Sequence, residues 1–74
     1  GDALRLLGEI RLGLGNPAGA ADAFGEWYTA FRASADWSDL TPAFRYVLAL
    51  QMAGRSAEAA EPARWAERVA RDFG

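Results

Sequence analysis

The amino-acid sequence predicts an all-α fold of two stacked antiparallel helix hairpins, and a repeated motif is the first reason. Residues 15–22, Gly-Asn-Pro-Ala-Gly-Ala-Ala-Asp, are echoed 39 residues later by residues 54–61, Gly-Arg-Ser-Ala-Glu-Ala-Ala-Glu. Each copy reads as a turn followed by an alanine-lined helix start, and a helical pattern of apolar residues precedes each. No stretch alternates with a period of two, so no strand is expected. A helix–turn–helix unit repeated in this way is typical of stacked hairpins that serve as interaction surfaces.

The first hairpin is expected over residues 2–34 and begins with a helix at residues 2–14. Asn16 then supplies an N-cap and Pro17 the first position of a second helix, which ends near residue 33. In the first helix, the apolar positions that follow the 3.6-residue period and mark the predicted buried face are Ala3, Leu7, Ile10 and Leu14. In the second, they are Ala20, Ala23, Phe24, Trp27, Tyr28 and Phe31.

A connector at residues 35–40 leads to the second hairpin, expected over residues 41–73. Thr41 and Pro42 repeat the cap-plus-proline signal and open a helix that runs to residue 53, where Gly54 ends it. Ser56 is predicted to cap a fourth helix that reaches residue 72 and contains Pro62. The apolar positions of the third helix are Phe44, Val47, Leu48 and Leu50. Those of the fourth are Ala59, Ala60, Ala63, Ala66, Val69 and Phe73.

Composition narrows the function classes. The 74 residues allow one domain, and the absence of Cys and His excludes disulfides, the usual zinc sites and the common nucleophile–base pairs. We therefore expect no enzyme activity, no cofactor and no metal. A net charge of −2, with eight Arg spread among ten acids, argues against nucleic acid as partner, and no apolar run is long enough for a membrane span.

Composition also gives an expectation about source and compartment. All cations are Arg, and Ala fills 17 positions, which favours a GC-rich, bacterial genome. The lack of Cys fits the cytoplasm, the compartment we expect, and it fits the periplasm as well.

The hairpin pattern resembles the tetratricopeptide repeat. The pair Leu7-Gly8, Gly15 at the turn, and Ala20 and Phe24 in an A-x-x-x-F pattern match the family's signature positions. Gly8 in mid-helix costs roughly 1 kcal/mol relative to Ala, which is reasonable if a second helix crosses closely there, with Ala20 as the expected small partner.

The second hairpin departs further from that family. Val47 replaces the glycine and Ala63 the aromatic residue, which suggests that large and small residues have exchanged sides. In the first hairpin, Trp27 stands where the family has a small alanine. The spacing of 39 residues also exceeds the family's repeat of about 34.

The resemblance implies a concave groove that binds a peptide or helix of a protein partner, lined by the first helix of each hairpin. The positions it implies are Asp2, Arg5, Glu9, Leu12, Thr41, Phe44, Leu48, Gln51 and Met52. Phe44, Leu48 and Met52 form an apolar stripe separate from the core face, and plain packing against the connector or a further hairpin is the alternative reading. Glu9 is expected to pair with Arg5 at i,i+4.

Two other functions stay open from the sequence. Trp65 is expected to face outward and, with Phe73, to form an apolar end for homo-oligomerisation, whereas Trp37 is expected to fold back over the hairpin junction. The chain could equally be a non-catalytic docking segment of a larger bacterial enzyme or regulator.

Overall fold

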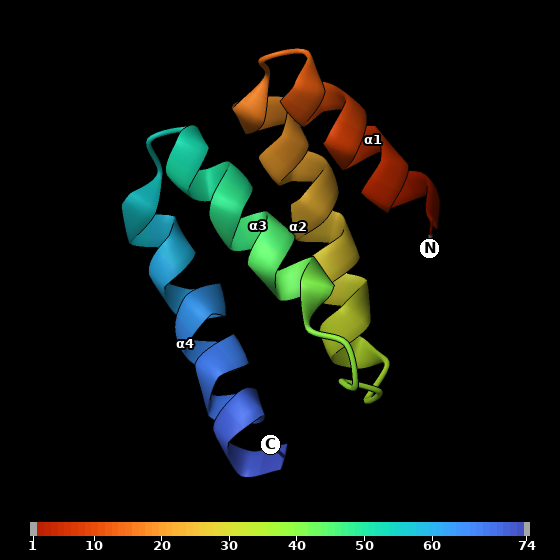
Figure 1. Ribbon diagram of the computed structural model, residues 1–74, viewed down its shortest axis with the longest axis vertical. Coiled ribbons are helices and arrows are strands. Elements are labelled where there is room, and N and C mark those ends of the chain that lie inside the picture. The colour runs from red at the N-terminus through yellow and green to blue at the C-terminus, as the bar shows by residue number, and fades with distance from the viewer. Residues whose placement is uncertain (1, 74) are drawn as a thin grey trace.

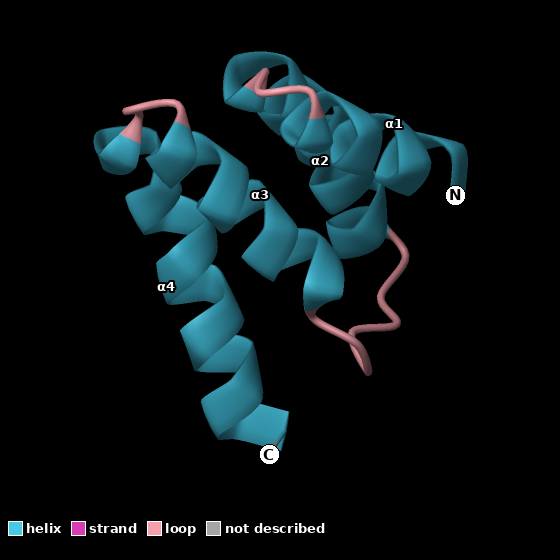
Figure 2. Cartoon of the chain, turned by 45° about the horizontal axis from the view of Figure 1, so that its top comes forward, coloured by secondary structure: helices cyan, strands magenta, loops and turns pink. Residues whose placement is uncertain are grey.

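Four α-helices make up the structure, a computed structural model that describes residues 2–73. They are α1 (Asp2–Gly13), α2 (Pro17–Ala33), α3 (Thr41–Met52) and α4 (Ser56–Phe73). Figure 1 shows the helices side by side in chain order, with α1 and α4 on opposite sides of the molecule. Short turns join α1 to α2 and α3 to α4, and a longer loop joins α2 to α3 (Figure 2). The all-α prediction is confirmed, and residues 2–73 contain no strand.

The 39-residue repeat extends to the backbone hydrogen bonds of the two turns. Gly15 and Gly54 both have φ of +76°, the left-handed conformation that favours glycine. Asn16 N–H donates to the carbonyl oxygen of Arg11 at 2.9 Å, and Arg55 N–H, 39 positions later, donates to that of Leu50 at 2.8 Å. The two hairpins therefore use the same turn in the same register, which makes residues 39 apart structurally equivalent.

The helix starts differ slightly from the expected caps. Asn16 Oδ1 accepts a hydrogen bond from Gly19 N–H at 3.0 Å, as predicted for an N-cap before Pro17. Thr41 and Ser56, in contrast, are the first helical residues of α3 and α4 instead of their caps. Leu40 is the N-cap residue of α3 and makes no side-chain capping bond, while Asp39 Oδ1 accepts hydrogen bonds from both the N–H and the hydroxyl of Thr41.

The core consists of two clusters. The first joins α2 to α3 and to the start of α4, and comprises Ala20, Ala21, Phe24, Ala49, Leu50 and Ala59. The second joins α2, α3 and the middle of α4, and comprises Tyr28, Ala43, Trp65, Ala66 and Val69. Because α1 packs on α2, α2 on α3 and α3 on α4, the helices α2 and α3 form the centre of the molecule and α1 and α4 its two sides.

The predicted buried face of α1 is wrong. Ile10 is 57% exposed and Leu14 79%, whereas Gly8 is the buried residue of this helix. A Cβ on Gly8 would lie 2.6 Å from Cδ1 of the Phe24 ring, so the small residue makes room for Phe24 and not for Ala20 as expected. The helix thus packs on its glycine face. Its leucine-rich face, which we call the α1 ridge, points to solvent and consists of Leu6, Leu7, Ile10 and Leu14.

The predicted buried face of α4 is also shifted. Ala63 is exposed, whereas Pro62 and Trp65 are buried. Alanines surround this helix on several sides, so their spacing alone does not select a face. The large Trp65 ring selects it, because it packs edge-on against Tyr28 and Phe31 of α2, with 5.7 Å between ring centroids in each pair.

Candidate partner-binding groove

The structure separates the predicted site residues into two groups. Those of α1, Arg5, Glu9 and Leu12, are half-buried. Those of α3, Phe44, Leu48, Gln51 and Met52, are exposed, with Phe44 and Met52 each at 56%. The two groups do not form one continuous lining.

The α1 group is engaged by its own chain. Leu12 packs against the first core cluster, and a carboxylate oxygen of Glu9 lies 3.3 Å from a guanidinium nitrogen of Arg45 on α3. Among residues 2–73, the expected pair of Glu9 with Arg5 is not formed. The Glu9 carboxylate is therefore paired with α3 of the same chain, in an ion pair whose two side chains stay partly exposed.

An apolar groove lies instead between α3 and α4. We call it the α3/α4 groove; it is open to solvent and has a volume of about 380 Å³. Its lining residues are Phe44, Val47, Leu48 and Gln51 from α3, and Ala63, Ala66, Glu67 and Ala70 from α4. Three of the nine positions predicted for a groove are among them, so the sequence identified one wall of the groove.

The other wall was missed. Ala63, Ala66 and Ala70 recur at helical spacing along one side of α4, and their short side chains leave the space that forms the groove. Ala63 and Ala66 are among the apolar positions that the sequence predicts for this helix, whereas Ala70 is not; Ala66 is buried in the second core cluster, and Ala63 and Ala70 are exposed. Gln51 and Glu67 are the polar groups among the lining residues, and the remainder is apolar.

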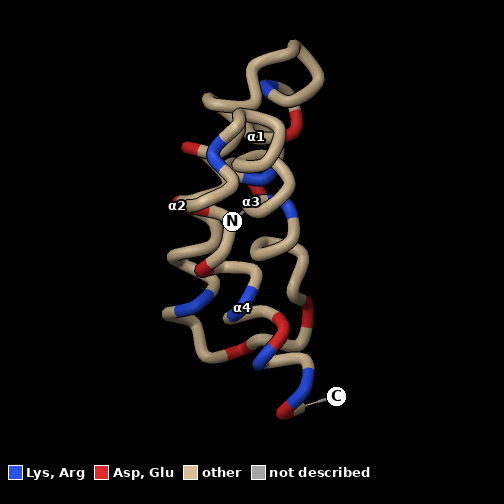
Figure 3. The backbone as a smooth tube through the Cα atoms, turned by 90° about the vertical axis from the view of Figure 1, so that its left-hand side faces the viewer, with Lys and Arg blue, Asp and Glu red and all other residues tan. Residues whose placement is uncertain are grey.

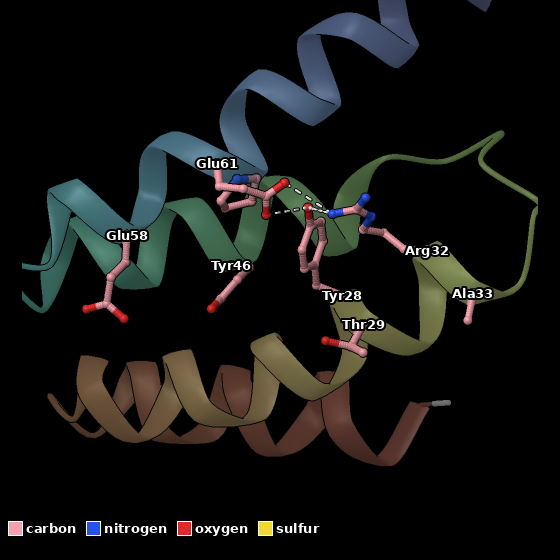
Figure 4. Close-up of a pocket in the computed structure, with 8 residues that line it drawn as sticks. Tyr28, Thr29, Arg32, Ala33, Tyr46, Glu58 and Glu61 are labelled. Carbon is pink, nitrogen blue, oxygen red and sulfur yellow. Dashed lines mark hydrogen bonds and ion pairs between the residues drawn. The ribbon is translucent and has the colours of Figure 1, made fainter.

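A polar recess of about 540 Å³ involves α2 and α4 (Figure 4). In it, Tyr28 donates its hydroxyl hydrogen to Glu61 at 3.2 Å, and Arg32 donates to the Tyr28 oxygen at 3.2 Å and to Glu61 at 3.1 Å. Arg32 also covers the ring of Trp65, with its Cζ 4.9 Å from the centroid. Burial raises the pKa of Tyr28, against the opposing effect of its hydrogen bond from Arg32. These groups bond to one another, so we interpret them as a clasp between α2 and α4.

Trp37 of the connector and Trp65 of α4 make contacts inside the chain. Trp65 is 7% exposed, so the expectation that it faces outward is wrong, and it offers little surface for self-association. Trp37 folds back as expected: its ring lies 5.3 Å from that of Trp65, and its Nε1–H donates to the Arg32 carbonyl at 3.1 Å. Phe73 stays exposed at the end of α4, beside Trp37.

Charged groups do not gather into a site of one sign. Arg and acidic residues are interspersed along α4 (Figure 3), and the structure pairs Arg71 with Glu67 at 2.9 Å. Within the described residues, no group of three or more acidic side chains is arranged to hold a metal ion. None of the helices formed by residues 2–73 combines the length and apolar character that a membrane crossing requires.

Comparison of the chain with protein-family models, with curated proteins and with solved structures gives no significant match. The likeness to tetratricopeptide repeats therefore stays a resemblance carried by its own residues. The function has to be argued from the geometry of the surfaces described above.

Proposed function

We propose that this chain is a non-catalytic protein-interaction module that binds an amphipathic helix or peptide segment in the α3/α4 groove. The observation that carries the proposal is an exposed apolar wall facing a row of alanines. Leu48 is 37% exposed and Phe44 56%, on a domain whose core is already formed by buried residues of α2, α3 and α4. Apolar side chains that line a groove outside the core are typical of helix-in-groove recognition.

The shape of the groove suits a helix. Its two walls are helices, and alanines on α4 allow another backbone to approach closely while Phe44 and Leu48 offer contact area from α3. Gln51 and Glu67 can satisfy polar groups at the edge of an incoming segment. A segment with leucines at i, i+3, i+4 and i+7 fits these features.

The test is a titration of the isotope-labelled chain with a model amphipathic peptide of roughly 15 residues that carries leucines at this spacing on a Lys, Glu and Ala background. We expect shifts of the amide NMR signals of Leu48, Ala63 and Ala70. A peptide of the same composition in scrambled order should produce none. Shifts that map to α1 or to the polar recess, or no shifts at all, would contradict the proposal.

A matched pair of variants completes the test. Leu48→Glu places a charge in the apolar wall and should weaken peptide binding by at least ~10-fold, while the helical circular dichroism persists because Leu48 is partly exposed. Ala30→Glu adds the same charge at an exposed position of α2 outside the α3/α4 groove and should leave the affinity unchanged. Loss of helicity in Leu48→Glu would show that Leu48 belongs to the core.

A further inference from the structure

The α1 ridge and the α3/α4 groove are unfilled surfaces at the two ends of one stack of helices. Leu6, Ile10 and Leu14 are all more than half exposed, on the side of α1 turned away from Gly8, which packs against Phe24 of α2. The alanine wall of the groove belongs to α4, which lies on the opposite side of the molecule from α1 (Figure 1). One copy of the chain therefore cannot bring its own ridge and groove together.

Within the chain, the first hairpin already binds a helix, since α3 packs against α2. Tyr46 of α3 lies against Gly25 of α2, where an added Cβ would be 3.1 Å from its ring, and its ring centroid is 5.2 Å from that of Tyr28. Ala49 of α3 belongs to the same buried cluster as Phe24 of α2. The packing of α3 on α2 is thus an established interface between one hairpin and the first helix of the next.

The 39-residue equivalence relates this interface to the free surfaces. Shifting the α3 contact positions back by 39 residues leads to α1, and shifting the α2 positions forward leads to α4. Tyr46, Ala49 and Ala53 of α3 correspond to Leu7, Ile10 and Leu14 of the α1 ridge. Phe24, Trp27 and Phe31 of α2 correspond to Ala63, Ala66 and Ala70 of the α3/α4 groove.

The sizes of the equivalent residues are complementary. In the interface inside the chain, the large Phe24 of α2 shares a buried cluster with the small Ala49 of α3. At the equivalent positions of the free surfaces the sizes are exchanged, because Ala63 lines the groove and Ile10 lies on the ridge. The combined volume across the contact is thereby kept, which is the condition for close packing at an interface of the same geometry.

The polar contact follows the same exchange. The Glu9–Arg45 ion pair that joins α1 to α3 has Leu48 and Leu6 as its equivalents. Both leucines are exposed in the structure, and each would meet the other across the second interface. At the equivalent positions both charged residues are replaced by leucines, so no charge would be buried against an apolar side chain. This supports a complementary contact.

From these observations we propose that the occupant of the α3/α4 groove is the α1 ridge of a second copy of this chain. The inference rests on the proposed function, since it names the partner of that same groove. A second copy is the occupant whose complementary surface is present on this chain. The contact is head to tail, so a dimer has one free groove on one copy and one free ridge on the other. Association therefore continues into an open series instead of stopping at a dimer.

Analytical ultracentrifugation of the 74-residue chain and three variants tests this inference. A single helix in a groove lies at the low end of interface sizes, so concentrations from ~10 µM to ~1 mM are appropriate. We expect the average mass of the unmodified chain to rise through and beyond that of a dimer. Ile10→Glu blocks the ridge and Leu48→Glu blocks the groove, and each variant alone should remain monomeric while keeping its helicity. Ala30→Glu is the matched charge control and should assemble like the unmodified chain.

The decisive sample is the equimolar mixture of Ile10→Glu with Leu48→Glu. The intact groove of the first accepts the intact ridge of the second, so the mixture should form a dimer and nothing larger. A mixture that stays monomeric, or self-association of either variant alone, would overturn the head-to-tail arrangement. If the unmodified chain is monomeric at ~1 mM but the model peptide binds the groove, this inference fails and the proposed function stands. If the peptide does not bind either, both fail.

Discussion

Replacing Gly8 by Ala tests the closest contact between α1 and α2. Helix propensity alone predicts a gain, because alanine is favoured over glycine inside a helix by up to ~1 kcal/mol. The structure predicts the opposite sign. The new methyl would lie 2.6 Å from Cδ1 and 2.7 Å from Cζ of Phe24, a ring that is fully buried and has no free space to move into.

The magnitude follows from a comparison with Gly13→Ala. Gly13 is also helical, but an added Cβ there meets nothing within 4 Å, so the propensity gain should be realised without strain. Forcing a methyl into a packed core typically costs ~1–3 kcal/mol. The difference in unfolding free energy between the two variants therefore isolates the strain, and Gly8→Ala should be the less stable by ~1–3 kcal/mol. That is a large share of the ~3–5 kcal/mol expected for a domain of this size.

Urea unfolding followed by circular dichroism measures both variants. A Phe24→Leu background removes part of the ring, so Gly8→Ala should be better tolerated there than in the unmodified chain, with a coupling energy of ~1 kcal/mol or more between the two sites. If Gly8→Ala stabilises the chain as much as Gly13→Ala does, the close approach of α1 and α2 at Gly8 is wrong.

The remaining predictions concern one ring and two titrations. Trp65→Ala should cost ~3–5 kcal/mol and abolish the helical dichroism, because it empties the centre of the second cluster, whereas Trp37→Ala, at a half-buried loop position, should stay folded. Because burial raises the pKa of Tyr28, stability should be full below about pH 10 and fall as the pH rises through the folded-state value; Tyr28→Phe should lose this dependence in alkaline unfolding curves. Hydrogen bonds from the hydroxyl and backbone N–H of Thr41 lower the pKa of Asp39, so these bonds should contribute to the stability of the fold above about pH 4, and the contribution should disappear as the pH falls. An Asp39 carboxyl that titrates by NMR at its ordinary value would contradict this.

The fold could be predicted from the sequence because its local signals agree with one another. Asn16 before Pro17, Gly15 and Gly54 at the turns, and the unbroken helical period each have a backbone cause that does not depend on distant contacts. The helix bounds follow from them to within one or two residues. Thr41 was taken for a cap because its hydroxyl is suited to that role, but Asp39 lies two residues earlier and accepts its hydrogen bonds instead.

The buried faces of the outer helices could not be predicted in the same way. Periodicity shows that Leu7, Ile10 and Leu14 share a side of α1, but a side that contacts another copy has the same pattern as one that contacts the core. Gly8 was recognised as a close approach, although its partner is the ring of Phe24. Trp65 of α4 is equivalent to Glu26 of α2 in the 39-residue repeat, and this equivalence predicts that it faces outward. The structure buries Trp65 instead, because its large apolar ring packs against α2.

The candidate site was predicted in part for a related reason. Phe44 and Leu48 were identified because they lie off the core face of α3, which the local pattern shows. Their counterpart across the groove is the alanine row of α4, whose role depends on what α3 leaves open. The α1 residues Glu9 and Leu12 were placed in a groove by resemblance, and the structure instead brings Glu9 to Arg45.

The exchange of large and small residues between the hairpins explains why only one wall of the groove was predicted. It also explains why copies of the chain would stack head to tail. The first hairpin carries Phe24 on α2 and accepts the small face of α3, so that interface is closed inside the chain. The second carries Ala63 at the equivalent place, and nothing within residues 2–73 fills the space before it. An identical pair of hairpins would have two interchangeable ends. Because the residues alternate in size, this chain has a ridge at one end and a groove at the other, and only a contact between unlike ends restores the packing that α2 and α3 already show.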